Sequence, residues 1–204
     1  MEGQKGFRKQ WFLVLMLVVI IITGCSNSNN TGNGKDADND RLANAVHSNN
    51  PITDEEVIAA QEAWAEGILS ISEAYMNEEN YRAVAQEVLD TLYGYKDGIV
   101  LFKPTLASDV PFRFTEEDAL SYFVTGSIAE DKGFAINPWV NVRFGEDKEI
   151  ILNGDTAFAM GTYYFTAPEN DEEVRVEYTF GYYRDDEGNI RIQLHHSSIH
   201  HSEN

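Results

Sequence analysis

The chain has 204 residues, with 15 Lys and Arg against 34 Asp and Glu, which gives a formal net charge of -19. This balance argues against a nucleic-acid partner, because phosphate backbones are bound by clustered Lys and Arg. Hydrophobic residues make up 43% of the chain and aromatic residues 12%, so a packed core is expected and global disorder is not. The single cysteine excludes an internal disulfide framework and a cysteine-based zinc cluster.

The N-terminus has the pattern of an export signal. Three basic residues within the first nine positions precede Trp11 to Ile22, an uncharged apolar run of twelve residues. A membrane span needs about 20 apolar residues, so this run is too short to span and fits the core of a signal peptide. The run ends at Thr23-Gly24-Cys25, which resembles the lipobox of bacterial lipoproteins. The resemblance implies that residues 1–24 are removed and that Cys25 is lipidated; the alternative is a buried core helix.

Residues 25–50 are expected to tether the protein to a membrane. Eight Asn, three Ser and two Gly follow the cysteine, a composition typical of a flexible linker. The acidic chain would be repelled by an anionic membrane surface, so the lipid on Cys25 would hold it there. We expect an exported protein on the periplasmic side of the cell envelope. The outer membrane is favoured, because Ser26 is not the Asp that tends to retain lipoproteins at the inner membrane.

From Pro51 onward the pattern predicts one folded domain, residues 51–204. Thr53 or Asp54 can cap a first helix, in which apolar residues recur at spacings of three and four as far as Tyr75. Two further helices are predicted, over Tyr81 to Tyr93 and from Glu116 to about Val124. The other predicted elements are strands, over Ile99 to Lys103, Trp139 to Phe144, Glu149 to Asn153, Thr156 to Thr166, Val174 to Arg184 and Ile190 to Ser198.

This order of elements indicates an α+β fold. Helices near the start and long antiparallel strands afterwards favour helices packed on one face of a strongly curved, mainly antiparallel sheet. Such a sheet, closed by helices, forms a cone with a pocket. The sequence shows no internal repeat and no second domain.

The last predicted strand carries side chains that could take part in a reaction. Strand side chains alternate between the two faces. The inward, apolar face is therefore expected to hold Ile190, Ile192, Leu194, His196 and Ser198. Two other interpretations stay open: His196 and Ser198 are buried and paired with backbone groups, or His200 joins His196 at i+4 in a metal site. The sequence has no P-loop, dinucleotide fingerprint, nucleophile elbow or H-E-x-x-H motif.

A family resemblance is carried by several segments in a fixed order. These are Leu101-Phe102-Lys103-Pro104-Thr105, Phe112-Arg113-Phe114-Thr115, Ala119-Leu120-Ser121-Tyr122-Phe123, the run from Asp131 to Trp139, Ala159-Met160-Gly161 and His195-His196-Ser197-Ser198. Across residues 53–199 the sequence resembles the iota-class carbonic anhydrases. Their domain is related to the association domain of calcium/calmodulin-dependent kinase and to the wider NTF2-like fold.

The resemblance implies reversible hydration of carbon dioxide to bicarbonate and a proton. It places the hydroxyls of Thr105, Tyr122 and Ser198 in the pocket, where they would orient and polarise the attacking water. His196 would exchange the proton, because an unperturbed imidazole has a pKa of about 6.5. Family members have been described both as metal-free and as using zinc or manganese. The spacing here favours the metal-free version, since no three good ligands converge on one face.

Aromatic residues are candidates for the walls of the carbon dioxide slot. These are Phe112, Phe134 and Trp139, with Phe114 and Phe165; ordinary core packing is the alternative for each. Lys103 and Arg113 either attract bicarbonate or are surface charges. The related folds imply a homodimer.

Other functions stay open at this point. The same cone could serve a noncatalytic NTF2-like lipoprotein that binds a small apolar ligand or acts as a scaffold, since this fold hosts many functions. An isomerase or cyclase of the same fold would need an inward Asp or Glu as its base, and the last strand supplies none.

Overall fold

The computed structural model describes residues 50–169 and 173–201. The predicted signal peptide, Cys25 and almost all of the predicted tether lie outside these residues. The helices are α2 (Asp54–Met76), α3 (Tyr81–Leu92) and α4 (Glu116–Val124), with the short 3-10 helices η1 (Gly94–Lys96) and η2 (Phe134–Ile136). The strands are β1 (Leu101–Lys103), β2 (Asn141–Phe144), β3 (Glu149–Asn153), β4 (Thr156–Thr166), β5 (Glu173–Arg184) and β6 (Ile190–Ile199).

The long helix α2 begins at a capping box. The Thr53 hydroxyl accepts a hydrogen bond from the backbone N–H of Glu56 at 3.3 Å, and the Glu56 carboxylate accepts one from the backbone N–H of Thr53 at 3.0 Å. Val57, Trp64 and Ile68 then recur along the buried face, as the periodicity predicts. No helix in the described part of the chain is long and apolar enough to cross a membrane.

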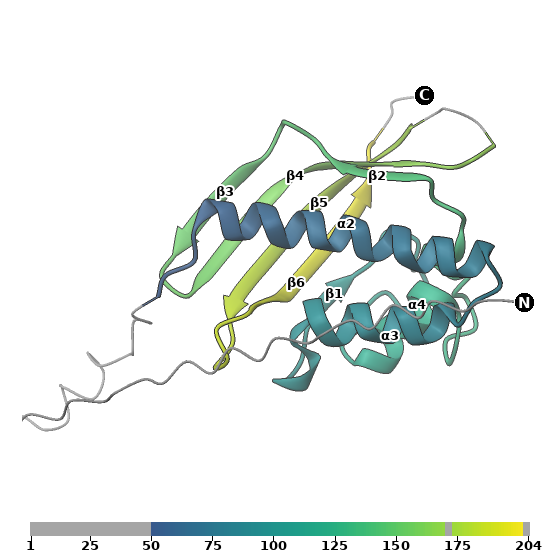
Figure 1. Cartoon of the computed structure of the whole chain (residues 1–204), viewed down its shortest axis with the longest axis horizontal. Coiled ribbons are helices and arrows are strands. Elements are labelled where there is room, and N and C mark those ends of the chain that lie inside the picture. Colours follow the sequence, from purple (N-terminus) through teal and green to yellow (C-terminus); the bar gives the residue numbers. More distant parts are fainter. Residues whose placement is uncertain (1–49, 170–172, 202–204) are drawn as a thin grey trace, which may run out of the picture. The chain divides into compact units, whose positions relative to one another are not determined.

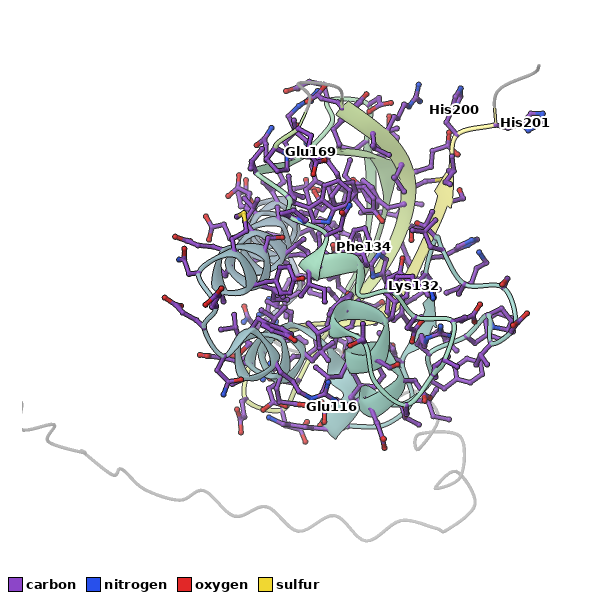
Figure 2. All side chains as sticks on the ribbon, turned by 90° about the vertical axis from the view of Figure 1, so that its right-hand side faces the viewer. Glu116, Lys132, Phe134, Glu169, His200 and His201 are labelled. Atoms are coloured by element: carbon purple, nitrogen blue, oxygen red, sulfur yellow. The ribbon has the colours of Figure 1, made fainter. Side chains whose placement is uncertain are left out.

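The strands form one sheet in the order β1-β6-β5-β4-β2, and β3 also pairs with β4. Only the pairing of β1 with β6 is parallel among these ladders; the others are antiparallel. Figure 2 shows the helices α2 and α3 on one side of the curved sheet. The predicted α+β architecture is therefore confirmed, with most predicted strand bounds within two residues of those observed.

The core lies between the helices and the inner face of the sheet. Trp64 of α2 is its centre: its ring stacks on Tyr163 at 5.3 Å and meets His195 edge-on at 5.4 Å. Phe102 of β1 and Phe123 of α4 close the side near α3. The core is thus largely aromatic, and two cavities that share lining residues lie near the end of β6.

Candidate active site

A small inner cavity lies among aromatic rings, with a volume of about 10 Å³. This is about the space that one water molecule requires. Six elements supply its walls: α2, β1 with the residues after it, α4, η2, β4 and β6. Its lining consists of Trp64, Phe102, Thr105, Tyr122, Phe123, Phe134, Tyr163, Phe165, His195 and Ser197. The polar members of this set are mostly hydroxyls, held in an otherwise apolar enclosure.

The last strand presents His195 and Ser197 to this cavity. These side chains are 2% and 4% exposed, whereas His196 is exposed and Ser198 is only partly buried. The prediction that His196 and Ser198 face inward is therefore wrong. The side chains of β6 that line the cavity are on the opposite face, at His195 and Ser197.

The physical reason is a β-bulge. Ile192 of β6 is paired with Tyr182 of β5, but the next paired residue is Leu194, opposite Gly181. Gln193 is therefore an extra residue in β6 with no partner in the ladder. One extra residue moves every later side chain to the other face of the sheet. Ile192 stays inward as predicted, and the alternation is reversed after it.

Thr105 and Ser197 form a pair of hydroxyls. The Thr105 hydroxyl donates a hydrogen bond to Ser197 Oγ at 2.8 Å. Thr105 follows β1, and β1 runs parallel to β6 with Lys103 opposite His196, so the strand pairing brings the two hydroxyls together. The sequence predicted Thr105 in this pocket correctly and missed Ser197.

Tyr122 reaches the same cavity from α4. Its side chain is 5% exposed, and its hydroxyl oxygen accepts a hydrogen bond from the backbone N–H of Leu106 at 3.4 Å. Burial raises the pKa of Tyr122, so its hydroxyl stays protonated near neutral pH. This residue was predicted correctly to line the pocket.

His195 is held between aromatic rings and two tyrosine hydroxyls. Its imidazole stacks on Phe102 at 4.7 Å and on Phe180 at 4.3 Å. Its Nδ1 lies 2.9 Å from the hydroxyl of Tyr93, and its Nε2 lies 3.4 Å from the hydroxyl of Tyr163. Burial, and secondarily the neighbouring His196, lowers the pKa of His195 to about 3. The imidazole is therefore neutral in the folded protein. This group leaves no pattern in the sequence, because Tyr93 and Tyr163 lie in no motif.

An outer cavity of about 390 Å³ adjoins the inner one and shares Thr105, Tyr122, Phe134 and Phe165 with it. Its other walls include Trp139, whose indole N–H donates to the Phe134 carbonyl oxygen at 2.8 Å. Lys132 lies on its rim, close to Phe134 in Figure 2. Phe134 and Trp139 therefore line the pocket, as predicted.

Phe112 does not line either cavity, so the prediction that it forms a wall of the slot is wrong. It is 49% exposed and stacks on Phe114 at 5.4 Å. The cause is Arg113, which is completely buried and forms an ion pair with Asp131 at 2.6 Å. Because Arg113 turns inward, its two neighbours turn outward. The buried ion pair also means that Arg113 is neither a surface charge nor a bicarbonate ligand.

The comparisons with known proteins agree on one family. The model of the metal-independent carbonic anhydrases matches residues 55–199. A metal-independent carbonic anhydrase from Nostoc sp. (strain PCC 7120) is 42% identical over 156 residues, which is 74% of this chain and 75% of that protein. The chain belongs to the metal-independent carbonic anhydrase family. The predicted membership among the iota-class carbonic anhydrases is confirmed.

One solved structure supports the same assignment. An iota-carbonic anhydrase from a cyanobacterium, complexed with bicarbonate, is 39% identical with a TM-score of 0.71, covering 75% of this chain and 95% of that one. A putative dehydratase of the NTF2-like family from Streptomyces avermitilis is 17% identical with a TM-score of 0.46, covering 72% and 96%. The predicted α+β fold class is confirmed. Membership in the metal-independent carbonic anhydrase family makes the chain an enzyme of the lyase class.

The family is metal-independent, in agreement with the metal-free site that the sequence favours. In residues 50–169 and 173–201, no group of three or more His, Cys, Asp and Glu side chains could hold a metal ion. His200 pairs with Glu177, with 2.8 Å between Nδ1 and Oε1. Figure 2 shows His200 and His201 beyond the end of β6, away from Phe134. A metal site at His196 and His200 is therefore not formed.

The loop that carries Thr105 is clamped by one carboxylate of this carbonic anhydrase. Glu130 accepts hydrogen bonds from the backbone N–H groups of Ser108, Asp109 and Val110 at 2.8 to 3.0 Å, and from the Ser108 hydroxyl. These bonds lower the pKa of Glu130 to about 2, so the clamp stays charged. Sequence analysis did not find Glu130, because it lies 20 residues or more from its partners along the chain.

Proposed function

We propose that this chain hydrates carbon dioxide reversibly in the inner cavity, with Thr105, Tyr122 and Ser197 as the groups that position the reactants. The observation that carries this proposal is the 2.8 Å hydroxyl pair of Thr105 and Ser197, in an aromatic enclosure with room for about one water. A neutral linear substrate needs an apolar slot beside a held water. The joined cavities offer both.

The directions of the hydrogen bonds suggest a role for each hydroxyl. Thr105 donates its hydrogen to Ser197, so its oxygen lone pairs can accept a hydrogen bond from the attacking water. The Leu106 N–H donates to the Tyr122 oxygen, which leaves the Tyr122 hydroxyl hydrogen free to donate to substrate. Thr105 would then orient the water, and Tyr122 would bind an oxygen of carbon dioxide.

In the reaction, the water oxygen forms a bond to the carbon while one C=O π pair moves onto its oxygen. Hydroxyl donors aimed at that oxygen stabilise the charge that develops there, and their fixed positions reduce the cost of reorganisation. The water loses one proton, and bicarbonate is the product. His195 cannot take this proton near neutral pH, because its pKa is lowered to about 3. The proton is released to solvent through the outer cavity.

The outer cavity is the route for substrate and product. Its walls are mainly apolar, which suits entry of carbon dioxide, and Lys132 on the rim carries a positive charge that attracts bicarbonate in the reverse reaction. Glu130 lies on the same rim but is occupied by the loop that it clamps.

Stopped-flow hydration of carbon dioxide by the full chain tests this function. Thr105→Val should lower kcat/KM by about a hundredfold, because a positioned hydroxyl is lost from the transition state. Thr179→Val is the matched control, because this threonine is paired with His196 on the outer face of the sheet. The variant should keep kcat/KM within about twofold of the parent, as expected for a substitution away from the site.

Three outcomes would change the conclusion. An inactive full chain, with metal supplied, would refute the enzyme and favour a noncatalytic binding lipoprotein. Activity that disappears on chelation and returns with zinc or manganese would refute the metal-free mechanism. A folded Thr105→Val variant at full rate would remove Thr105 from the site.

We further propose that the chain is a lipoprotein anchored through Cys25 in the cell envelope, with the outer membrane favoured. The apolar run before Thr23-Gly24-Cys25 and the lone cysteine support this. Labelled palmitate should be incorporated into the full chain and not into Cys25→Ser. Label in both proteins, or in neither, would contradict lipidation at this residue, and fractionation of the envelope would identify the membrane.

We also propose a homodimer that buries the outer face of the sheet. A row of residues in register crosses five strands there and includes Ile151, Phe158 and Leu101, which are 66%, 46% and 54% exposed. A contiguous apolar patch on an exposed sheet face is typical of an interaction surface. Light scattering should give twice the chain mass, and Phe158→Glu should give a monomer. A monomeric parent protein would refute the dimer.

A further inference from the structure

The loop that carries Thr105 is closed at its ends and held along its length. It starts after β1 and ends at Arg113, whose backbone N–H donates to the Phe102 carbonyl oxygen of β1 at 2.8 Å. Between these ends, the Glu130 carboxylate accepts four hydrogen bonds from residues 108–110. The position of Thr105 therefore depends on the segment that contains Glu130.

Asp131, the next residue in that segment, joins the loop to α4. Its Oδ1 accepts a hydrogen bond from Arg113 Nη2 at 2.6 Å, and its Oδ2 accepts one from the Ser121 hydroxyl at 2.7 Å. Ser121 Oγ also accepts from the backbone N–H of Ile128 at 3.0 Å. The three side chains are completely buried, so the loss of one bond leaves a buried polar group without its partner.

The same contacts reach Tyr122 of α4 in two ways. Tyr122 directly follows Ser121, so the bond between Ser121 and Asp131 limits rotation of the helix about its axis at this point. The Arg113 guanidinium carbon lies 5.9 Å from the centre of the Tyr122 ring, within the range of a cation–π contact. The backbone N–H of Leu106, in the loop, donates to the Tyr122 hydroxyl oxygen at 3.4 Å. The loop and the helix therefore meet where the pocket hydroxyls lie.

We propose that the adjacent carboxylates of Glu130 and Asp131 are positioning residues for the reaction. Together they fix the separation between the Thr105 and Tyr122 hydroxyls. This inference rests on the proposed carbon dioxide hydration, in which Thr105 orients the water and Tyr122 binds an oxygen of carbon dioxide. Water and carbon must approach at a defined distance and angle, and a misplacement of about 1 Å can lower a rate by about a hundredfold.

Ser121→Ala in the full chain tests the contact with α4. Substitution of Asp131 would remove the closest partner of the buried Arg113 charge and is expected to unfold the protein. Ser121→Ala keeps that ion pair and removes the bond between Asp131 and the helix. It should lower kcat for carbon dioxide hydration by about tenfold with KM within about twofold, because the Tyr122 hydroxyl is then misplaced for the transition state.

Thr162→Val is the matched control for this loss. The Thr162 hydroxyl is also buried and donates to an aspartate carboxylate, that of Asp147, and neither residue lines either cavity. Thr162 lies on the face of β4 opposite to Tyr163. The variant should lose stability as Ser121→Ala does, with kcat within about twofold of the parent.

A double-mutant cycle separates positioning from a general loss of structure. If Ser121 acts through the Tyr122 hydroxyl, Ser121→Ala should change kcat by less than about twofold in a Tyr122→Phe background, where that hydroxyl is absent. A general loss of structure would lower kcat about equally in both backgrounds.

Glu130→Gln tests the contact with the loop and applies even if Ser121→Ala does not fold. An amide presents one oxygen where the carboxylate presents two, so part of the clamp on residues 108–110 is lost. We expect kcat to fall by about fivefold, because the position of Thr105 is then less well defined. This loss should disappear in a Thr105→Val background.

Amide hydrogen exchange at Leu106 gives a readout that does not depend on activity. Its N–H donates to the Tyr122 oxygen, so displacement of the loop or of the helix exposes it. Ser121→Ala should increase its exchange rate by about fivefold, as expected for the loss of one hydrogen bond, and Thr162→Val should leave it unchanged.

The outcomes separate this inference from the proposed function. In an active parent protein, an unchanged kcat in Ser121→Ala and in Glu130→Gln would overturn the inference. So would an equal loss of kcat in Thr162→Val, or a loss that persists in the Tyr122→Phe background. An inactive parent protein in which Leu106 exchange responds as expected would instead refute carbon dioxide hydration, and an unchanged exchange rate would overturn the positioning role whatever the activity.

Discussion

The two faces of β6 carry the same pair of residue types in very different surroundings. On the inner face, His195 is buried among aromatic rings and its pKa is lowered to about 3. On the outer face, His196 is exposed; partial burial and nearby Lys103 lower its pKa, but not to a comparable extent. The adjacent histidines thus differ because of what surrounds them. Residue type alone does not assign the role.

The two serines show the same contrast. Ser197 accepts from Thr105 at 2.8 Å inside the cavity, whereas the Ser198 hydroxyl lies 3.5 Å from a Glu177 oxygen on the outer face. Glu177 also pairs with His200, in an ion pair whose members are 52% and 41% exposed. Exposed ion pairs contribute little to stability. Around Ser198, at the end of β6, the outer face is thus solvated, whereas the inner face around Ser197 is a fixed polar site.

Exchanging each serine for alanine should give the largest difference between the faces. Ser197→Ala should lower kcat/KM by about a hundredfold, because it removes a donor from the transition state. Ser198→Ala should stay within about twofold of the parent. Stopped-flow carbon dioxide hydration measures both, and circular dichroism checks that both variants fold. The reverse ranking would return the catalytic role to Ser198.

The wrong assignment of the two faces has one local cause. Alternation correctly predicts Ile192 as inward and Gln193 as outward, and it fails only from Leu194 onward. Nothing in the residues from Ile190 to Leu194 marks a bulge, because Gln is an ordinary strand residue at an exposed position. The bulge follows from pairing with Gly181 and Tyr182, which lie on another strand. Local periodicity contains no information about that pairing.

Other features were accessible from sequence to different degrees. Helix bounds followed from capping and spacing, as at Thr53, and two strands were predicted to the residue. Thr105 and Tyr122 were found through the family resemblance, because they lie in its motifs. Tyr93 and Tyr163 were missed, since hydrogen bonds to His195 that span 102 and 32 residues leave no pattern in the chain.

The loss of folding stability at low pH should depend more on His195 than on His196. His195 has a folded pKa of about 3, below its unfolded value, so the unfolded chain binds more protons between these two values. Its contribution is fully present above about pH 6.5 and is lost as the pH falls toward 3, by at most about 1.4 kcal/mol per pH unit. The free energy of unfolding, measured with denaturant from pH 7 to pH 4, should fall less steeply with falling pH in His195→Gln than in the parent.

His196→Gln is the matched comparison for this slope. The pKa of His196 is also lowered, so its contribution has the same sign, but its side chain is exposed and the change should be small. Equal slopes in the two variants would mean that the inner face is not the more strongly desolvated one. The many carboxylates of the chain titrate identically in both variants, so the difference between the slopes isolates the histidines.

Deletion of Gln193 should have the smallest effect. Without this residue, Ile192 and Leu194 become neighbours opposite Tyr182 and Gly181, and regular alternation places Leu194 outward and His195 inward. The deletion therefore removes the bulge and keeps both faces as they are. Carbon dioxide hydration should stay within about threefold of the parent, because the lost local twist is the only change near the site. A folded but inactive variant would mean that the bulge also sets the distance between Ser197 and Thr105, so that sheet curvature, as well as the choice of face, determines the site.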